Sequence, residues 1–170
     1  PDNPYIYDRL TGREFLELVG SLYGMDRKII SERIDWLFEL FGVDEWGDDF
    51  AAEYSHGMRQ KIIMASAIMH DPKLVVIDEP MVGLDPQSQR LVKGVLRKLV
   101  ERGASVFMST HTLSVAEEIC TRIGIIHKGV LMKVGTLEEL RRAAQMEGRS
   151  LEELFVKLTG GEREIKLWDE

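Results

Sequence analysis

The amino-acid sequence predicts an α/β protein in which an α-helical subdomain precedes a partial parallel-sheet core. Two observations carry this prediction. The first 70 residues show helical periodicity and no strand pattern, whereas short apolar runs alternate with helical segments from Leu74 onward. The chain has 170 residues, 44% hydrophobic and 30% charged, which is enough for about one globular domain with its own core.

Three helices are predicted in the first part of the chain. In the first, after Gly12, the apolar residues recur at helical spacing: Phe15, Leu18, Val19 and Leu22. The second spans about 26–41 and ends at Gly42, with one apolar face made of Ile30, Ile34, Leu37, Phe38 and Phe41. The third runs from about Ser55 to His70, where Asp71-Pro72 ends it. Between the last two, residues 43–54 are predicted to form an acidic loop.

Strand patterns begin at Leu74-Val75-Val76-Ile77, which predicts a buried parallel strand because both of its faces are apolar. A second strand is predicted at Ser105-Val106-Phe107-Met108. Between the two strands, Asp85 can cap a helix that has Pro86 as its first residue. This strand–helix–strand order predicts a parallel pair joined by a right-handed crossover.

The rest of the chain predicts one β-hairpin and three helices. Residues 123–126 and 130–134 flank His127-Lys128-Gly129, with glycine in the turn. A serine or threonine three residues before a glutamate is the capping-box pattern, and it occurs at Ser114, Thr136 and Ser150. Each of these three positions is therefore predicted to open a helix.

Composition excludes several classes of function. The 22 Lys and Arg residues against 29 Asp and Glu residues give a net charge of −7, so we expect no nucleic-acid partner. The single cysteine, Cys120, cannot form an intramolecular disulfide. The longest apolar stretch, Ile62–Met69, is far shorter than the about 20 residues of a membrane span. We therefore expect a cytoplasmic protein.

Two adjacent carboxylates, Asp78 and Glu79, follow the first predicted strand. Ligands of open α/β sheets bind at the carboxyl ends of the strands. Successive side chains of a strand point in opposite directions, so one carboxylate can face a metal while the other faces an attacking water. That division suits phosphoryl transfer with Mg²⁺. Taken alone, the pair is explained equally well as a strand end with solvated side chains.

Two further groups are candidates for phosphate contacts. His111 follows the second predicted strand, where it can contact a γ-phosphate or order a water. Ser55-His56-Gly57-Met58 opens the third helix with a hydroxyl, a glycine and free backbone amides, which together suit an anion. When each is considered alone, an ordinary loop histidine and a plain serine N-cap are the favoured explanations.

Four motifs stand in a fixed order: Tyr54-Ser55-His56-Gly57-Met58-Arg59-Gln60, Leu74-Val75-Val76-Ile77-Asp78-Glu79-Pro80, Gly83-Leu84-Asp85 and Ser109-Thr110-His111. This order resembles the nucleotide-binding domain of ATP-binding-cassette (ABC) transporters, where the motifs are the signature motif, Walker B, the D-loop and the switch histidine. The resemblance implies a P-loop NTPase-like core. Residues 1–70 would be the Q-loop region and helical signature subdomain, 71–135 a partial RecA-like ATPase core, and 136–170 C-terminal helices and a tail.

The resemblance also implies roles for the acidic residues and the histidine. Asp78 would hold Mg²⁺ largely through water, and Glu79 would be the general base. His111 would contact the γ-phosphate, and Asp85 would cross the dimer interface. Pro1-Asp2-Asn3-Pro4 resembles the Q-loop, with Asp2 where glutamine is usual, which implies Mg²⁺ or water contacts for Asp2.

The signature motif is implied to bind ATP that is held by the opposite subunit. Ser55 and Gly57 would contact its γ-phosphate, with His56 and Met58 in the same motif. The family's usual signature is L-S-G-G-Q, so Tyr54, His56 and Met58 replace three of its five positions. The serine and the second glycine, which the phosphate needs, are retained.

The P-loop pattern G-x-x-x-x-G-K-[ST] does not occur in these 170 residues, and neither does any Gly-Lys pair. We expect the P-loop and its lysine upstream of Pro1, in a longer protein. We therefore expect these residues alone to bind ATP poorly and to hydrolyse it at a negligible rate. We also expect the missing strands to leave the Leu74–Ile77 strand with an unpaired edge and an uncovered apolar face, which favours self-association.

The implied function is that of an ATP-binding subunit which hydrolyses ATP to power transport. The implied partners are a second nucleotide-binding domain, identical or different, and a membrane-embedded permease on whose cytoplasmic side the subunit lies. Residues 150–155 and Leu158-Thr159-Gly160 resemble exporter cassettes. One alternative is a non-transport ABC-type ATPase, which the absence of a long inserted coiled coil disfavours. The other is a non-catalytic interaction fragment, which an upstream P-loop would eliminate.

Overall fold

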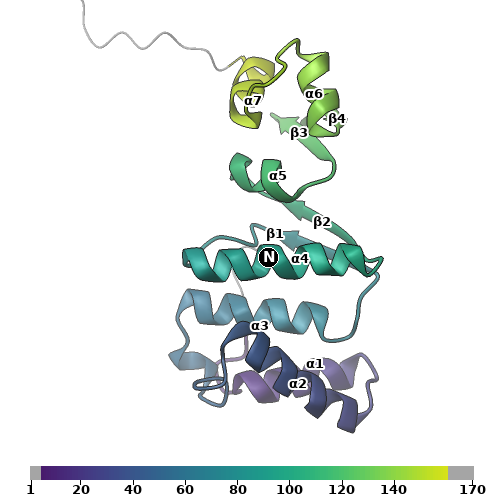
Figure 1. Ribbon diagram of the computed structural model, residues 1–170. Helices are drawn as coiled ribbons and strands as arrows, with labels where there is room; N and C mark the ends of the chain where they lie inside the picture. Colours follow the sequence, from purple (N-terminus) through teal and green to yellow (C-terminus); the bar gives the residue numbers. More distant parts are fainter. Residues whose placement is uncertain (1–4, 161–170) are drawn as a thin grey trace, which may run out of the picture. The chain divides into compact units, whose positions relative to one another are not determined.

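The computed structural model describes residues 5–160, and the chain divides into two compact units with the boundary between Ser109 and Thr110 (Figure 1). The first unit contains three packed helices, α1 (Gly12–Leu22), α2 (Arg27–Phe41) and α3 (His56–Ile68). All three predicted helices are thus confirmed. Their shared core is formed by side chains with almost no exposed surface, among them Leu16, Ile34, Leu37, Phe38 and Ile62.

Local capping explains where these helices begin and end. Thr11 caps α1 in a complete capping box with Glu14, and Asp26 caps α2. Gly42 ends α2 in the left-handed conformation, with φ 59°. The predicted loop over 43–54 is hydrogen-bonded throughout much of its length and includes a short 3₁₀ helix, η1 (Ala51–Glu53).

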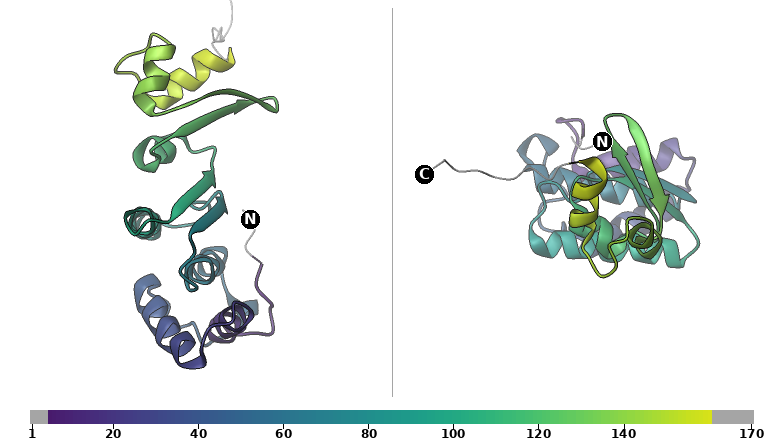
Figure 2. Two further views of the ribbon diagram at one scale, coloured as in Figure 1. Left: turned by 90° about the vertical axis from the view of Figure 1, so that its right-hand side faces the viewer. Right: turned by 90° about the horizontal axis from the view of Figure 1, so that it is seen from above.

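The sheet of the first unit is one parallel pair. Strand β1 (Leu74–Asp78) pairs with β2 (Ser105–Ser109), and α4 (Pro86–Glu101) connects them. Figure 2 (left) shows α4 on one side of the two strands, and α4 contacts β2. The parallel strand–helix–strand unit that the sequence predicts is confirmed.

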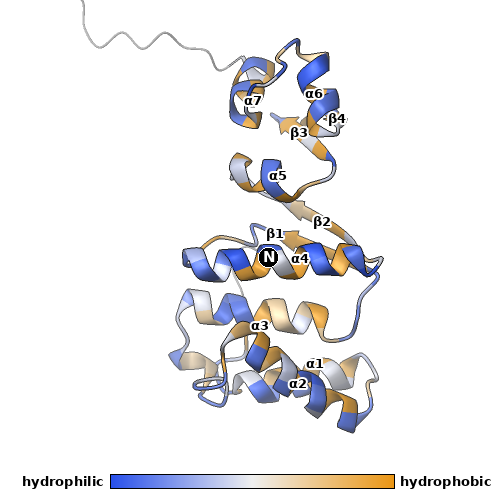
Figure 3. Ribbon diagram, in the orientation of Figure 1, coloured by the Kyte–Doolittle hydropathy of each residue, from blue (hydrophilic) through white to orange (hydrophobic). Residues whose placement is uncertain are grey.

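The prediction that the Leu74–Ile77 strand is buried on both faces is wrong for the described residues. Val75 is buried, with 4% of its surface exposed, but Leu74 and Val76 on the other face are 60% and 68% exposed. Phe107, the partner of Val76 in the register, is 67% exposed. The uncovered apolar face that was expected is thus present. Figure 3 shows β1 and β2 coloured mostly as hydrophobic residues. Within residues 5–160, β1 pairs only with β2.

The second unit contains α5 (Leu113–Ile119), an antiparallel hairpin and two further helices. The predicted hairpin is confirmed as β3 (Ile123–His127) and β4 (Val130–Gly135), with a register shift between Ile125 and Ile126. The helices are α6 (Leu137–Ala143) and α7 (Leu151–Thr159). Six buried residues form the core of this unit: Ala116, Ile123, Ile125, Leu140, Leu151 and Leu154.

Two of the three predicted capping boxes are confirmed, at Thr136 and Ser150. The third is wrong, because α5 begins at Leu113 with Thr112 as its N-cap, so Ser114 lies inside the helix. Glu117, which should have completed that box, instead accepts hydrogen bonds from Arg141 Nη2 at 2.7 Å and from the Leu151 amide at 2.9 Å. Its carboxylate therefore ties α5 to α6 and α7.

No helix within the described residues has the length and hydrophobicity that crossing a membrane requires.

Candidate functional site

The carboxyl end of β1 places Asp78 and Glu79 beside the end of β2. Asp78 pairs with Ser109 in the parallel register, and the Ser109 hydroxyl donates a hydrogen bond to Asp78 Oδ1. The Glu79 amide donates to the Ser109 carbonyl oxygen at 3.0 Å. Ser109 therefore fixes the side chain of Asp78 and the backbone of Glu79 at once.

Glu79 has an unusual backbone conformation, with φ 47° in the left-handed region. For a residue with a side chain this conformation costs about 1–2 kcal/mol, so the surrounding structure must hold it in place. It turns the chain sharply after the strand, and the Val82 amide donates to the Glu79 carbonyl oxygen at 3.2 Å. Glu79 is half-buried, whereas Asp78 is exposed.

Asp85 begins α4, as predicted. Its Oδ1 accepts from the amides of Gln87 and Ser88 at 2.9 and 3.0 Å, and its Oδ2 accepts from the Ser88 hydroxyl at 2.5 Å. The hydrogen bond from the Ser88 hydroxyl, followed by that from the Ser88 amide, lowers the pKa of Asp85 below its ordinary value. Its carboxylate thus fixes the start of α4, and its contact across a dimer interface stays a prediction.

The signature-like segment forms the start of α3, with Ser55 as the N-cap. The Ser55 hydroxyl accepts from the Met58 amide at 3.3 Å. The amides of His56 and Gly57 lie in the first turn, where a helix offers N–H groups without intrahelical partners. This arrangement has the form of an anion site, because those amides and the helix dipole both favour negative charge.

The start of α3 packs against the loop that follows Glu79. A Cβ atom added to Gly83 would lie 2.1 Å from Cδ2 of His56 and 2.8 Å from its Nε2, so the imidazole ring covers Gly83. A Cβ on Gly57 would lie 3.1 Å from the Gly83 carbonyl oxygen. Two of the motifs that the sequence predicts, at His56-Gly57 and at Gly83, are therefore in direct contact.

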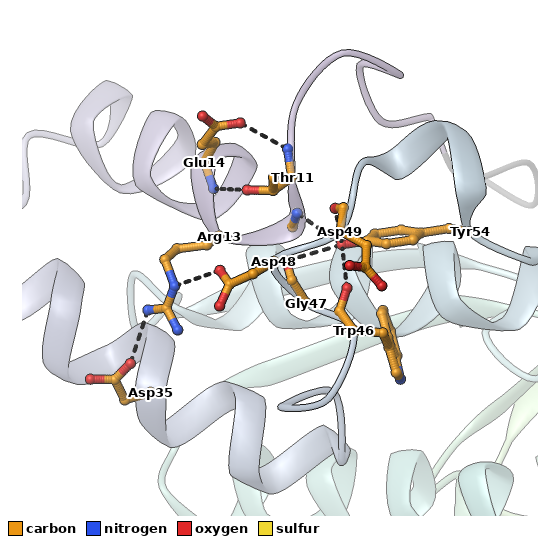
Figure 4. Close-up of polar contacts among 10 residues, drawn as sticks. Thr11, Arg13, Glu14, Asp35, Trp46, Gly47, Asp48, Asp49 and Tyr54 are labelled. Atoms are coloured by element: carbon orange, nitrogen blue, oxygen red, sulfur yellow. Dashed lines mark hydrogen bonds and ion pairs between the residues drawn. The ribbon is translucent and has the colours of Figure 1, made fainter.

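Tyr54, which stands where the family has leucine, anchors the start of α3 to α1 (Figure 4). Its hydroxyl accepts from the Gly12 amide at 2.9 Å and lies 3.2, 3.0 and 3.0 Å from the carbonyl oxygens of Trp46, Gly47 and Asp49. Burial raises the pKa of the Tyr54 phenol, so it keeps its single proton, which it can donate to one of these carbonyl oxygens at a time. A leucine would leave the Gly12 amide without this acceptor.

The other two predicted residues, His111 and Asp2, belong to other parts of the chain. His111 belongs to the second unit, in the turn that leads from β2 to α5, where the Thr112 amide donates to the Thr110 hydroxyl at 3.0 Å. Its approach to Asp78 stays a prediction. Asp2 lies outside the described residues.

The donors at the end of β1 fit a magnesium ion that takes most of its ligands from water and phosphate. Within residues 5–160, no three His, Cys, Asp or Glu side chains cluster in a way that could hold a metal by themselves. Asp78 is exposed and has the Ser109 hydroxyl beside it, and such a carboxylate fits Mg²⁺ because this ion is usually bound through one or two carboxylates plus substrate phosphates.

The sequence predicts Ser109 as part of the Ser109-Thr110-His111 motif, but not that its side chain bonds Asp78. The available signal was its place at the end of the second strand. If Ser105–Met108 pairs in parallel with Leu74–Ile77, the next residue of each strand, Ser109 and Asp78, are neighbours.

Comparison with known proteins decides the family. The chain is 37% identical over 163 residues to the ABC transporter ATP-binding protein YthP of Bacillus subtilis (strain 168), covering 96% of this chain and 69% of YthP. This chain belongs to the ABC transporter ATP-binding protein family. A second ABC member, the transporter ATP-binding protein EcsA of the same organism, is 36% identical over 94% of this chain and 64% of EcsA.

Structural and family-model comparisons agree with ABC membership. A solved structure described as an ATP-binding subunit of an ABC transporter matches with a TM-score of 0.88 and 35% identity, over 93% of this chain and 66% of that one. A family model described as an AAA domain, putative AbiEii toxin of a type IV toxin–antitoxin system, matches residues 27–117. This ABC chain spans 64% of the length of EcsA and 66% of that of the solved subunit.

Proposed function

We propose that this chain carries the Walker B, D-loop, signature and switch-histidine portions of a subunit that hydrolyses ATP to power transport. The observation that carries the proposal is the end of β1, where the Ser109 hydroxyl holds Asp78 and the Ser109 carbonyl holds the backbone of Glu79. Mg²⁺, when bound, would neutralise phosphate charge, and Asp78 would hold it largely through water. Glu79 positions the attacking water and accepts its proton.

The other predicted residues complete this site in the proposal. The partner subunit's nucleotide is bound by the start of α3 through Ser55 and Gly57, with His56 and Met58 beside them. Asp85 reaches across the dimer interface. His111 contacts the γ-phosphate of the nucleotide that its own subunit holds, and Asp2 contributes to Mg²⁺ or water contacts.

The proposed partners follow from membership of the ABC family. The subunit pairs with a second nucleotide-binding domain and lies on the cytoplasmic face of a membrane, bound to a permease. The resemblance of the α7 region, Ser150–Phe155 and Leu158–Gly160, to exporter cassettes supports export as the direction of transport.

Equilibrium binding of labelled ATP tests whether tight ATP binding requires the proposed P-loop in addition to this chain. We expect the 170 residues alone to bind ATP at least about a hundredfold more weakly than the intact subunit. The reason is that the P-loop lysine and amides supply several charge-assisted hydrogen bonds of about 1.5–3 kcal/mol each. The intact subunit with its P-loop lysine replaced by alanine is the matched control. Equal affinity of the chain and the intact subunit would contradict the proposal.

Self-association of the isolated chain is a separate expectation that rests on the exposed face of β1 and β2. Light scattering should show dimers or larger species, because the apolar face with Val76 at 68% exposure and the unpaired edge of β1 within residues 5–160 both favour association with another copy. Val76→Lys should shift the chain toward monomer. Val100→Lys, at a 46% exposed position on α4, is the matched control and should leave association unchanged. A wild-type chain that stays monomeric at all concentrations contradicts the expectation.

A further inference from the structure

The contact between His56 and Gly83 joins the start of α3 to the loop that follows Glu79. His56 is the first residue of α3, at the candidate anion site. Gly83 lies in the loop between Glu79 and α4, with φ 74°, a conformation that glycine adopts without strain. Because a Cβ on Gly83 would lie only 2.1 Å from His56 Cδ2, the ring occupies the space where a side chain would be. A movement of either segment toward the other is therefore resisted directly.

The loop that carries Gly83 is held as one piece. The Gln89 side-chain amide, on α4, donates to the carbonyl oxygens of Leu84 at 3.1 Å and Met81 at 3.4 Å. Met81 and Leu84 are themselves buried. The Val82 amide closes the turn on Glu79 at 3.2 Å. The loop therefore has hydrogen bonds both to Glu79 and to α4, and few of its parts can move independently.

We propose that the His56 ring couples the two nucleotide sites of the dimer by pressing on Gly83. The inference rests on the proposed function, in which the start of α3 contacts ATP held by the partner subunit while Glu79 acts on ATP held by its own. A phosphate that draws in the start of α3 at one site then shifts the loop that sets Glu79 at the other. His56 is in this sense a positioning residue, and binding at one site changes affinity at the other through a contact inside one chain.

The test is the ATP dependence of hydrolysis by the intact subunit. The wild type should show a Hill coefficient above 1, with an upper limit of about 2 for two sites, and His56→Ala should lower it to about 1. If His56 only contacted a phosphate, His56→Ala would change the ATP concentration at half-saturation and leave the Hill coefficient unchanged. Gly83→Ala should also lower the Hill coefficient, because its methyl group displaces the ring, although Gly83 itself offers no side chain to a phosphate.

Gly24→Ala is the matched control for backbone strain. Gly24 has φ 71°, close to that of Gly83, but nothing lies within 4 Å of where its Cβ would be. The Gly24→Ala variant should therefore keep the wild-type Hill coefficient. An unchanged Hill coefficient in His56→Ala, or a value of 1 in the wild type, overturns the coupling and leaves the ATPase intact as a proposal. Absence of any Glu79-dependent hydrolysis would instead refute the proposed function.

A second measurement detects the coupling without turnover. Hydrogen exchange of the amides of Val82 and Leu84, in the chain itself, should be faster in His56→Ala by about tenfold or more, because the loop loses the ring that packs on it. The Gly24→Ala variant should not change the exchange of these amides. Identical protection in the wild type and His56→Ala would show that the ring does not hold the loop and would overturn the inference.

Discussion

Replacing Glu79 with glutamine is expected to lower ATP hydrolysis by the intact subunit by about 10²–10⁴-fold while leaving ATP binding in place. Glutamine has nearly the same shape as glutamate but cannot accept the proton of the attacking water. The amide of residue 79 still donates to the Ser109 carbonyl oxygen, so the local backbone is retained. Because ATP stays bound and uncleaved, the variant should accumulate as an ATP-bound dimer. Phosphate release measures the first effect, and light scattering with and without ATP measures the second.

Glu101→Gln is the control for this experiment. Glu101 is an exposed residue at the end of α4, so the same chemical change there should leave hydrolysis within about twofold of the wild type. Hydrolysis by Glu79→Gln at the wild-type rate would remove Glu79 from the role of general base. Loss of ATP binding together with hydrolysis would show that Glu79 contributes mainly to binding.

The substitution Gly47→Ala is expected to destabilise the helical part of the first unit by about 2–3 kcal/mol, within the range for overpacked cores. A Cβ on Gly47 would lie 2.2 Å from Cε2 and 2.4 Å from Cζ of Phe38, a ring that is almost completely buried. The ring has little room to move, because it is 2% exposed and the Arg13 guanidinium lies over it, 4.9 Å from its centroid. The Gly47 carbonyl oxygen also accepts from the Arg13 amide at 3.2 Å, so the backbone is held as well.

Urea denaturation of the chain, followed by circular dichroism, measures this effect as a lower midpoint. Gly94→Ala is the matched control, because Gly94 lies inside α4 and nothing is within 4 Å of where its Cβ would be. That substitution should raise stability by up to about 1 kcal/mol, since alanine is the better helix former. Equal midpoints for the two variants would show that the contact between Gly47 and Phe38 relaxes at little cost.

Local signals made most of the secondary structure predictable. Helix starts at Thr136 and Ser150, the helix end at Gly42 and the hairpin turn at Gly129 are each specified by residues within one turn of the position itself. The failure at Ser114 shows the limit of such signals. Glu117 accepts hydrogen bonds from Arg141 and from the Leu151 amide, which belong to other helices, instead of completing a capping box at Ser114.

Contacts between distant residues could not be predicted from local patterns. The bond between the Gly12 amide and the Tyr54 hydroxyl spans 42 residues, and that between Asp78 and Ser109 spans 31. Such pairs depend on how helices and strands pack, and many pairings are compatible with the same periodicity. Whether Leu74 and Val76 are exposed depends in the same way on what covers the sheet. An apolar strand sequence indicates that the strand can be buried, but not which element buries it.

The sequence by itself determined the order of the helices and strands, the ABC-like order of the motifs and the candidate residues at Asp78 and Glu79. Each of these depends on the identity and spacing of neighbouring residues, which the chain specifies directly. Only the tertiary structure decided that Ser109 holds Asp78 and that the ring of His56 rests on Gly83. These contacts join separate elements, and the distances between separate elements are set by packing rather than by local preference.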